Sequence, residues 1–118
     1  MDFETKHDDA TTTTYETGAK RSDRTGKGRF DLIPPHSLTR LAKVYERGAI
    51  TKGSNNWMKG MEFSRCIDSA LRHLNQYRMG MVDEDHIGHA CFNLFAIMHF
   101  QETNTGTDDI TKQDAKLL

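Results

Sequence analysis

The fold of this chain is decided by one stretch, residues 62–100, which reads EFSRCIDSALRHLNQYRMGMVDEDHIGHACFNLFAIMHF. Its first part, residues 63–77, places apolar side chains three and four positions apart, as one stripe of a helix does. Its last part, residues 87–100, repeats that spacing and adds apolar residues on the other faces. A helix that is apolar on nearly every side is buried on nearly every side. The stretch therefore predicts two packed helices joined by the acidic turn at residues 80–85.

Three polar side chains share one side of the second helix of this pair. His86, His89 and Asn93 are spaced i, i+3 and i+7, so they stack on one face of an otherwise apolar helix. Buried polar groups need partners, and a ligand or metal cavity between the helices is one way to supply them. His86 and His89 could bind zinc, although no clear third and fourth ligands accompany them.

The composition excludes several classes of protein. The chain has 118 residues, 28% of them charged, and a net charge of −1, so no field favours nucleic acid or an anionic membrane. No apolar run approaches the ~20 residues of a membrane span, and the first residues lack the basic and apolar regions of a signal peptide. Cys66 and Cys91 lie in apolar stripes, as small reduced core residues do. We expect a cytoplasmic protein without membrane or direct nucleic-acid partners.

The distribution of polar residues divides the chain into three parts. Residues 1–26 are rich in Thr, Asp and Lys and indicate a flexible leader. Residues 27–101 are expected to form the helical domain. Residues 102–118 are expected to form a polar tail, which holds either a short helix from Asp109 to Leu118 or no element.

The helical domain begins with a further helix, which Pro35 and Ser37 start and Gly48 ends near Arg47. With the pair in residues 62–100 this makes three helices, too few to bury a generous core within one chain. We therefore predict an all-α helical bundle that is completed by oligomerisation. The expected assembly is a dimer or tetramer in which helices of two chains form a joint bundle.

Two loops carry candidate binding residues. The turn at residues 26–35 contains Lys27 and Arg29 among glycines, so its amides could approach a phosphate, although a plain solvated turn has the same composition. The loop at residues 50–60 contains Trp57, whose indole could stack on a base. The same side chain could equally close the end of the bundle.

Charged residues on the helix pair support two interpretations. Arg65, Asp68 and Arg72 are spaced i, i+3 and i+7, as in a surface ion-pair ladder. Alternatively, Asp68 could bind a divalent ion while the arginines bind a polyphosphate, which is what phosphoryl chemistry requires. The acidic residues 83–85 could add ligands from the second helix, or they could cap that helix and complement its dipole. Carboxylates on two facing helices are typical of all-α nucleotide pyrophosphohydrolases.

A set of short motifs between residues 29 and 100 is informative as a combination, although no single motif is. They are Arg29-Phe30-Asp31-Leu32-Ile33-Pro34, Gly48-Ala49, Gly53, Asn56-Trp57, Arg65, Asp68, Arg72-His73 and the segment from Asp83 through His89 to Asn93. With them the chain resembles a family of small phage and bacterial proteins, the dATP/dGTP diphosphohydrolase-like family. The resemblance implies a MazG-like all-α fold and hydrolysis of dGTP or dATP to the monophosphate and pyrophosphate, with Mg²⁺ or Mn²⁺ as cofactor. In phage members the dGMP supplies precursor for 2-aminoadenine DNA.

The resemblance also implies roles for individual residues. Asp68 and Asp85 are the expected metal ligands, with Glu46 or Glu84 completing the set. His73 or His86 would order the attacking water. The substrate would be bound by the remaining candidates, with Arg29, Lys52, Arg65 and Arg72 on the phosphates and Asn56, Trp57 and Asn93 on the sugar and base.

The chain departs from the common MazG pattern, which places Glu-Glu-x-x-Glu on one helix and Glu-x-x-Asp on the next. In the corresponding places it has Asp68-x-x-x-Arg72-His73 and Asp85-His86-x-x-His89. The resemblance therefore supports the fold and the substrate class more than it supports particular metal ligands. Two other functions stay open. One is a nucleotide-binding regulatory module without turnover, and the other is a helical interaction protein whose charged residues form only salt bridges.

Overall fold

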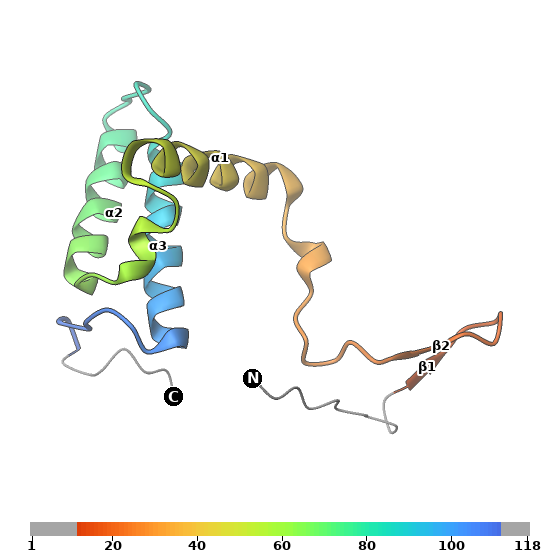
Figure 1. Ribbon diagram of the computed structural model, residues 1–118. Coiled ribbons are helices and arrows are strands. Elements are labelled where there is room, and N and C mark those ends of the chain that lie inside the picture. Colours follow the sequence, from red (N-terminus) through yellow and green to blue (C-terminus); the bar gives the residue numbers. More distant parts are fainter. Residues whose placement is uncertain (1–11, 112–118) are drawn as a thin grey trace. The chain divides into compact units, whose positions relative to one another are not determined.

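The structure, a computed structural model, describes residues 12–111 (Figure 1). Within this range it contains three long helices, two short 3-10 helices and one two-stranded sheet, which confirms the predicted all-α fold class. The chain divides between Pro34 and Pro35 into two compact units. The second unit holds all three long helices and the candidate site.

The N-terminal unit contains a short β-hairpin. Strand β1 (Thr12–Thr14) pairs antiparallel with β2 (Lys20–Ser22), and Gly18 adopts a φ of +87° in the turn between them. The sequence predicts a flexible leader here, but β-branched threonines favour strands and a glycine permits the turn. A 3-10 helix, η2 (Phe30–Leu32), follows.

The helical unit is built on the predicted pair of helices. Helix α2 (Phe63–Arg78) and helix α3 (His86–Thr103) lie side by side, joined by the turn that contains Gly80 (Figure 1). Helix α1 (Pro35–Lys52) packs on α3 near this turn, and the 3-10 helix η3 (Asn56–Lys59) packs farther along α3. This arrangement places α1 beside the acidic turn, where the candidate site lies.

Helix α1 is longer than the sequence predicts, and the predicted end at Gly48 is wrong. The helix continues through Gly48 to Lys52, and Gly53, with a φ of +92°, ends it by donating its amide to the Ala49 carbonyl at 3.0 Å. A glycine inside a helix costs about 1 kcal/mol relative to alanine, which tertiary packing can outweigh. The extra turn adds Ile50 and Thr51 to the wall of the cleft described below.

The core at one end of the unit is aromatic. Phe63, Cys66, Ala96 and Phe100 are buried together, and Phe63 and Phe100 stack with ring centroids 6.0 Å apart. Trp57 is half-buried against this cluster. Its ring lies 4.8 Å from that of His99 and 5.9 Å from that of Tyr45 (centroids). Trp57 therefore closes the end of the bundle, as one of its two interpretations predicts.

At the other end, a glycine lets α1 approach α3 closely. A Cβ at Gly88 would lie 2.9 Å from Cγ2 of the buried Val44, inside van der Waals contact. Glycine alone has no side chain to oppose this approach. The crossing point of α1 on α3 is thereby set within the first turn of α3.

The segment after α3 turns back to the start of α2. Asn104, with a φ of +55°, ends α3, and Phe63 donates its amide to the Thr107 carbonyl at 2.9 Å. Asp109 accepts the Ser64 amide at 2.9 Å and so caps α2. The predicted short helix from Asp109 to Leu118 lies largely outside the described residues, and residues 109–111 form a turn.

No helix in residues 12–111 combines the length and the apolar character that a membrane span requires.

Candidate active site

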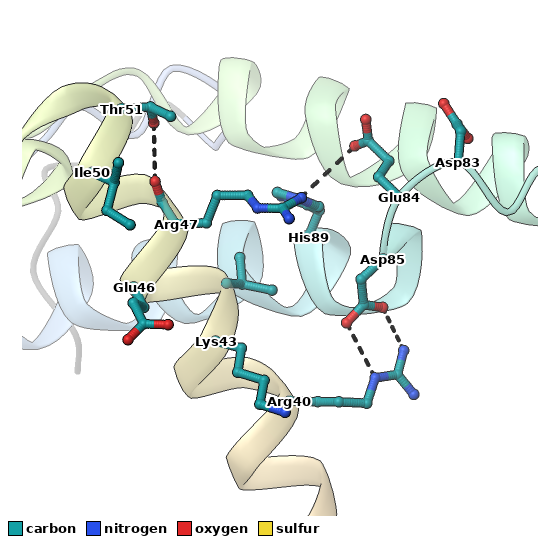
Figure 2. A pocket seen from close by; sticks show the side chains of 11 residues that line it. Arg40, Lys43, Glu46, Arg47, Ile50, Thr51, Asp83, Glu84, Asp85 and His89 are labelled. Atoms are coloured by element: carbon teal, nitrogen blue, oxygen red, sulfur yellow. Dashed lines mark hydrogen bonds and ion pairs between the residues drawn. The ribbon is translucent and has the colours of Figure 1, made fainter.

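A cleft of about 820 Å³ lies between α1 and the start of α3 (Figure 2). Its α1 wall carries cationic side chains, and its other wall carries the acidic residues of the turn and one histidine. The lining residues are Arg40, Lys43, Val44, Glu46, Arg47, Ile50, Thr51, Asp83, Glu84, Asp85 and His89. Opposite charges therefore face each other across a space large enough for a small ligand.

The cationic wall comes from one face of α1. Arg40, Lys43 and Arg47 are spaced i, i+3 and i+7, so they project on the same side of the helix. Among residues 12–111, Lys43 and Arg47 make no salt bridge. Both are available for an anionic ligand. The spacing is visible in the sequence, but the position of these side chains opposite the acidic turn is not.

Asp85 joins the two walls of the cleft. Its carboxylate accepts hydrogen bonds from the Arg40 guanidinium, with Nε at 3.1 Å from Oδ2, and from the Gly88 amide at 2.9 Å (Figure 2). The Arg40 guanidinium, with help from the Gly88 amide, lowers the pKa of Asp85 to about 2. Asp85 is thus an ionised helix cap and a link between α1 and α3.

We predict that Asp85→Asn destabilises the protein by about 1–2 kcal/mol at pH 7. The pKa shift from 3.8 to about 2 corresponds to about 2.5 kcal/mol, and partial exposure of the carboxylate reduces this. Because the pKa is lower in the folded state, the contribution is complete above pH 4 and disappears as the pH falls toward 2. Urea unfolding of both proteins from pH 7 to pH 2 measures this difference.

The matched control for this prediction is Asp68→Asn, because Asp68 also pairs with an arginine but is exposed. The control should leave the free energy of unfolding unchanged at every pH. A difference between wild type and Asp85→Asn that stays constant down to pH 2 would contradict the account.

A second group of side chains meets beside the acidic wall. His73 from α2, Glu84 from the turn and His89 from α3 each place one ligand atom within 4.8 Å of the others. Oε1 of Glu84 lies 3.5 Å from Nδ1 of His73 and 3.8 Å from Nε2 of His89. Burial lowers the pKa of His73, so its imidazole is neutral at pH 7. Two imidazoles and a carboxylate are a donor set that can hold a divalent metal.

Behind this group, His86 connects His73 to Asp83. His86 is 2% exposed; its Nδ1 lies 2.9 Å from Nδ1 of His73 and its Nε2 lies 2.8 Å from Oδ1 of Asp83. A carboxylate accepts only, so Nε2 of His86 carries the proton of this contact. In the neutral ring, Nδ1 of His86 then accepts from Nδ1–H of His73. The buried histidines thus supply each other's hydrogen bonds.

The structure gathers some of the predicted site residues near this cleft. Glu46, Glu84 and Asp85 line it, from both walls. His73 and His86 lie next to it, in contact with each other. His89, which the sequence suggested only as a possible zinc ligand, lines the cleft and, like Glu84, also belongs to the converging group with His73.

Other predicted residues lie elsewhere. The carboxylate of Asp68 pairs with Arg72 at 3.8 Å, is 77% exposed and does not line the cleft. The amide of Asn93 donates to Oγ of Ser69 at 3.2 Å and to the His89 carbonyl at 2.8 Å, so it supports the helix pair. Two further residues, Lys52 and Asn56, do not line the cleft either.

The remaining predicted residues serve other contacts. Arg65 lines a separate pocket of about 560 Å³ with Lys59 at the start of α2. Trp57 packs on the aromatic core. Arg29, in the N-terminal unit, forms a bidentate ion pair with Asp31 at 2.8 Å.

Comparison with known proteins gives one result. A protein family described as "dATP/dGTP diphosphohydrolase, N-terminal" matches residues 17–110 of the chain. No curated protein and no solved structure matches the chain.

Proposed function

The chain belongs to the family of dATP/dGTP diphosphohydrolase N-terminal domains, and from this premise we propose that it hydrolyses dATP or dGTP to the monophosphate and pyrophosphate. The cleft between α1 and the acidic turn would be the active site. A contribution to phage nucleotide metabolism that feeds 2-aminoadenine DNA stays a prediction from the resemblance.

One observation carries the proposal: cationic side chains and groups that could hold a metal face each other in a single cleft. Lys43 and Arg47 lie on one wall without salt bridges among the described residues, while Glu84 and His89 lie on the other. A nucleoside triphosphate carries several negative charges, which require both cationic side chains and a divalent metal for binding and reaction. The α1 wall offers the cationic side chains, and the opposite wall offers the groups that would hold the metal.

The residues fit a divalent cation, which we propose to be the cofactor. Glu84, His73 and His89 would hold it, because their ligand atoms already converge. When bound, the cation would neutralise phosphate charge and lower the pKa of a bound water. Mg²⁺ and Mn²⁺ are the cofactors that the family resemblance implies.

The chain's own residues would perform the rest of the reaction. Lys43 and Arg47 bind the phosphates and stabilise the negative charge that develops on pyrophosphate as it leaves. The oxygen of water forms a bond to the α-phosphorus, and the bond from that phosphorus to the bridging oxygen breaks. The proton of water passes to a base on the acidic wall. His86 and Asp83 hold the ring of His73 in place.

The test is incubation of the purified protein with each of the four dNTPs and Mg²⁺ or Mn²⁺, with separate detection of pyrophosphate and orthophosphate. The expected result is pyrophosphate and monophosphate from dATP or dGTP, and little from the pyrimidine substrates. Tight nucleotide binding without any product would instead support the alternative, a nucleotide-binding regulatory module. Orthophosphate as the product would contradict attack at the α-phosphorus.

We also propose that the chain self-associates through the outer faces of α2 and α3. Large apolar side chains are exposed there: Leu71, Leu74, Leu94, Phe95 and Met98, each between 41% and 61%. Monomers rarely leave so many apolar side chains together in water, whereas oligomer interfaces bury them.

Phe95→Glu should therefore dissociate the oligomer, because it would place a charge in the buried interface. Light scattering coupled to size exclusion should give a dimer or tetramer mass for the wild type and a monomer mass of 13.5 kDa for the variant. The control Ile50→Glu changes an equally apolar, 80% exposed residue on α1 and should leave the mass unchanged. A monomeric wild type would contradict the proposal.

A further inference from the structure

We infer that His73, Glu84 and His89 form a binding site for a first-row transition-metal ion, such as Zn²⁺, Co²⁺ or Mn²⁺, in preference to Mg²⁺. This inference names the class of cofactor that the cleft takes. It rests on the proposed function only for the use of the metal in hydrolysis, because metal binding itself can be measured without nucleotide.

The ligand atoms of the three groups converge, as those of a metal site do. Zinc–nitrogen and zinc–oxygen bonds are about 2.0–2.2 Å, so two ligands of a tetrahedral ion lie about 3.3–3.5 Å apart. Oε1 of Glu84 lies 3.8 Å from Nε2 of His89, and one ligand atom of each of the three residues lies within 4.8 Å of the others. His73 would coordinate through Nε2, because its Nδ1 donates to His86. Side-chain rotations would bring the three ligand atoms from their present separations to this spacing.

The donor atoms select the type of metal. Imidazole nitrogen suits Zn²⁺, Co²⁺ and other first-row transition metals, whereas Mg²⁺ prefers oxygen ligands and keeps several waters. Two nitrogens and one carboxylate oxygen also match the three-ligand pattern of catalytic zinc sites, in which a further position stays open for water or substrate. The cleft beside Glu84 and His89 would give access to this open position.

The neighbouring carboxylates of the turn are already engaged. Asp85 accepts from Arg40 and from the Gly88 amide, and Asp83 accepts from His86. Within residues 12–111, the Glu84 carboxylate forms ion pairs only with the two histidines of the proposed site. An all-oxygen site for Mg²⁺ on this wall would require breaking one of the other contacts.

The surrounding structure orients one of the ligands. His86 and Asp83 form a hydrogen-bonded chain behind His73, and His86 is almost completely buried. Metal-binding histidines are commonly held by such partners, whose removal weakens metal affinity about 10–100-fold.

The experiment uses the full chain without a histidine tag, freed of metal by a chelator. Co²⁺ is titrated while its visible absorption is recorded, Zn²⁺ is then used to displace it, and Mg²⁺ is tested as a competitor in excess. The variants are His89→Ala and Glu84→Gln, both at partly exposed positions that the fold tolerates more readily than the buried His73. The matched control is His36→Ala, an exposed histidine in the first turn of α1 that lies outside the cleft.

The wild type and His36→Ala should bind one Co²⁺ per chain, with the absorption of a nitrogen-coordinated ion that excess Mg²⁺ does not remove. His89→Ala and Glu84→Gln should bind at least about 100-fold more weakly. Equal Co²⁺ affinity in wild type and His89→Ala, or displacement of Co²⁺ by comparable Mg²⁺, would overturn the inference. Tight Co²⁺ binding with no pyrophosphate from any dNTP would leave this site in place and refute the proposed function instead.

Discussion

Glu84→Gln should lower the rate of pyrophosphate release from dATP or dGTP at least about 100-fold. Removing a residue that only supports a metal ligand already costs about 10–100-fold in affinity or activity, and Glu84 would bind the metal directly. The substitution keeps the size of the side chain but removes the negative charge between His73 and His89. The cation would lose its only carboxylate in this group, and the cleft would lose its means of activating water. Steady-state kinetics with saturating Mn²⁺ measure the effect, because kcat should fall even when the metal concentration is raised.

Two further glutamates provide the comparison. Glu102→Gln changes an exposed residue near the end of α3 and should leave kcat/KM unchanged. Glu46→Gln changes the opposite wall of the same cleft and should reduce kcat/KM by less than about 10-fold, since Glu46 is outside the converging group. A larger loss at Glu46 than at Glu84 would move the metal to α1 and contradict the assignment made from the structure.

Phe100→Ala should destabilise the helical unit by about 3–5 kcal/mol, the usual cost of removing a buried aromatic ring. Phe100 is 0% exposed and stacks on Phe63, and Trp57 lies against it with ring centroids 6.2 Å apart. No neighbouring side chain can fill the space without moving the helices. Because a small domain has only about 5–15 kcal/mol of stability, the variant should be partly unfolded at 37 °C.

The fluorescence of Trp57, the only tryptophan, reports this directly because its ring packs on the same cluster. Urea titrations followed by Trp57 emission should show a much lower midpoint for Phe100→Ala. Phe30→Ala, which removes the same ring from an 80% exposed position in the N-terminal unit, should show the wild-type midpoint. A loss below about 1 kcal/mol in Phe100→Ala would mean that this cluster is not the main core.

The helix pair could be predicted from the sequence because its signals are local. Apolar spacing of three and four residues and Gly80 between the helices agree with each other, and the observed α2 and α3 begin and end within three residues of the predicted ranges. The end of α1 could not be predicted in this way. Gly48 is a local stop signal, but packing of α1 on α3 outweighs it, and Gly53 provides the left-handed cap.

The site depends on which residues meet across helices, and spacing within one helix does not contain that information. His73 meets His86 because both lie close to the turn that joins α2 and α3. Asp68 is five residues farther from the turn, about 7.5 Å along the helix, and its carboxylate points to solvent. Of the two predicted metal ligands, Asp85 therefore lines the cleft and Asp68 lies outside it, while Glu84 lines the cleft beside Asp85.

The cationic wall was missed for a related reason. Arg40, Lys43 and Arg47 are visible as a stripe in the sequence, but a stripe of cations on a helix is usually a solvated surface. Its importance depends on α1 crossing α3 at Gly88, which brings the stripe opposite the acidic turn. Only the tertiary structure shows that these charges face Glu84 and His89 across the cleft.

The most direct test of the central claim is the position of the metal and the nucleotide in a crystal grown with Mn²⁺ and a non-hydrolysable dGTP analogue. The account predicts an anomalous manganese peak within bonding distance of Glu84 and His89, with the triphosphate against Lys43 and Arg47. A manganese peak beside Asp68, or a nucleotide in the separate pocket near Lys59 and Arg65, would contradict it.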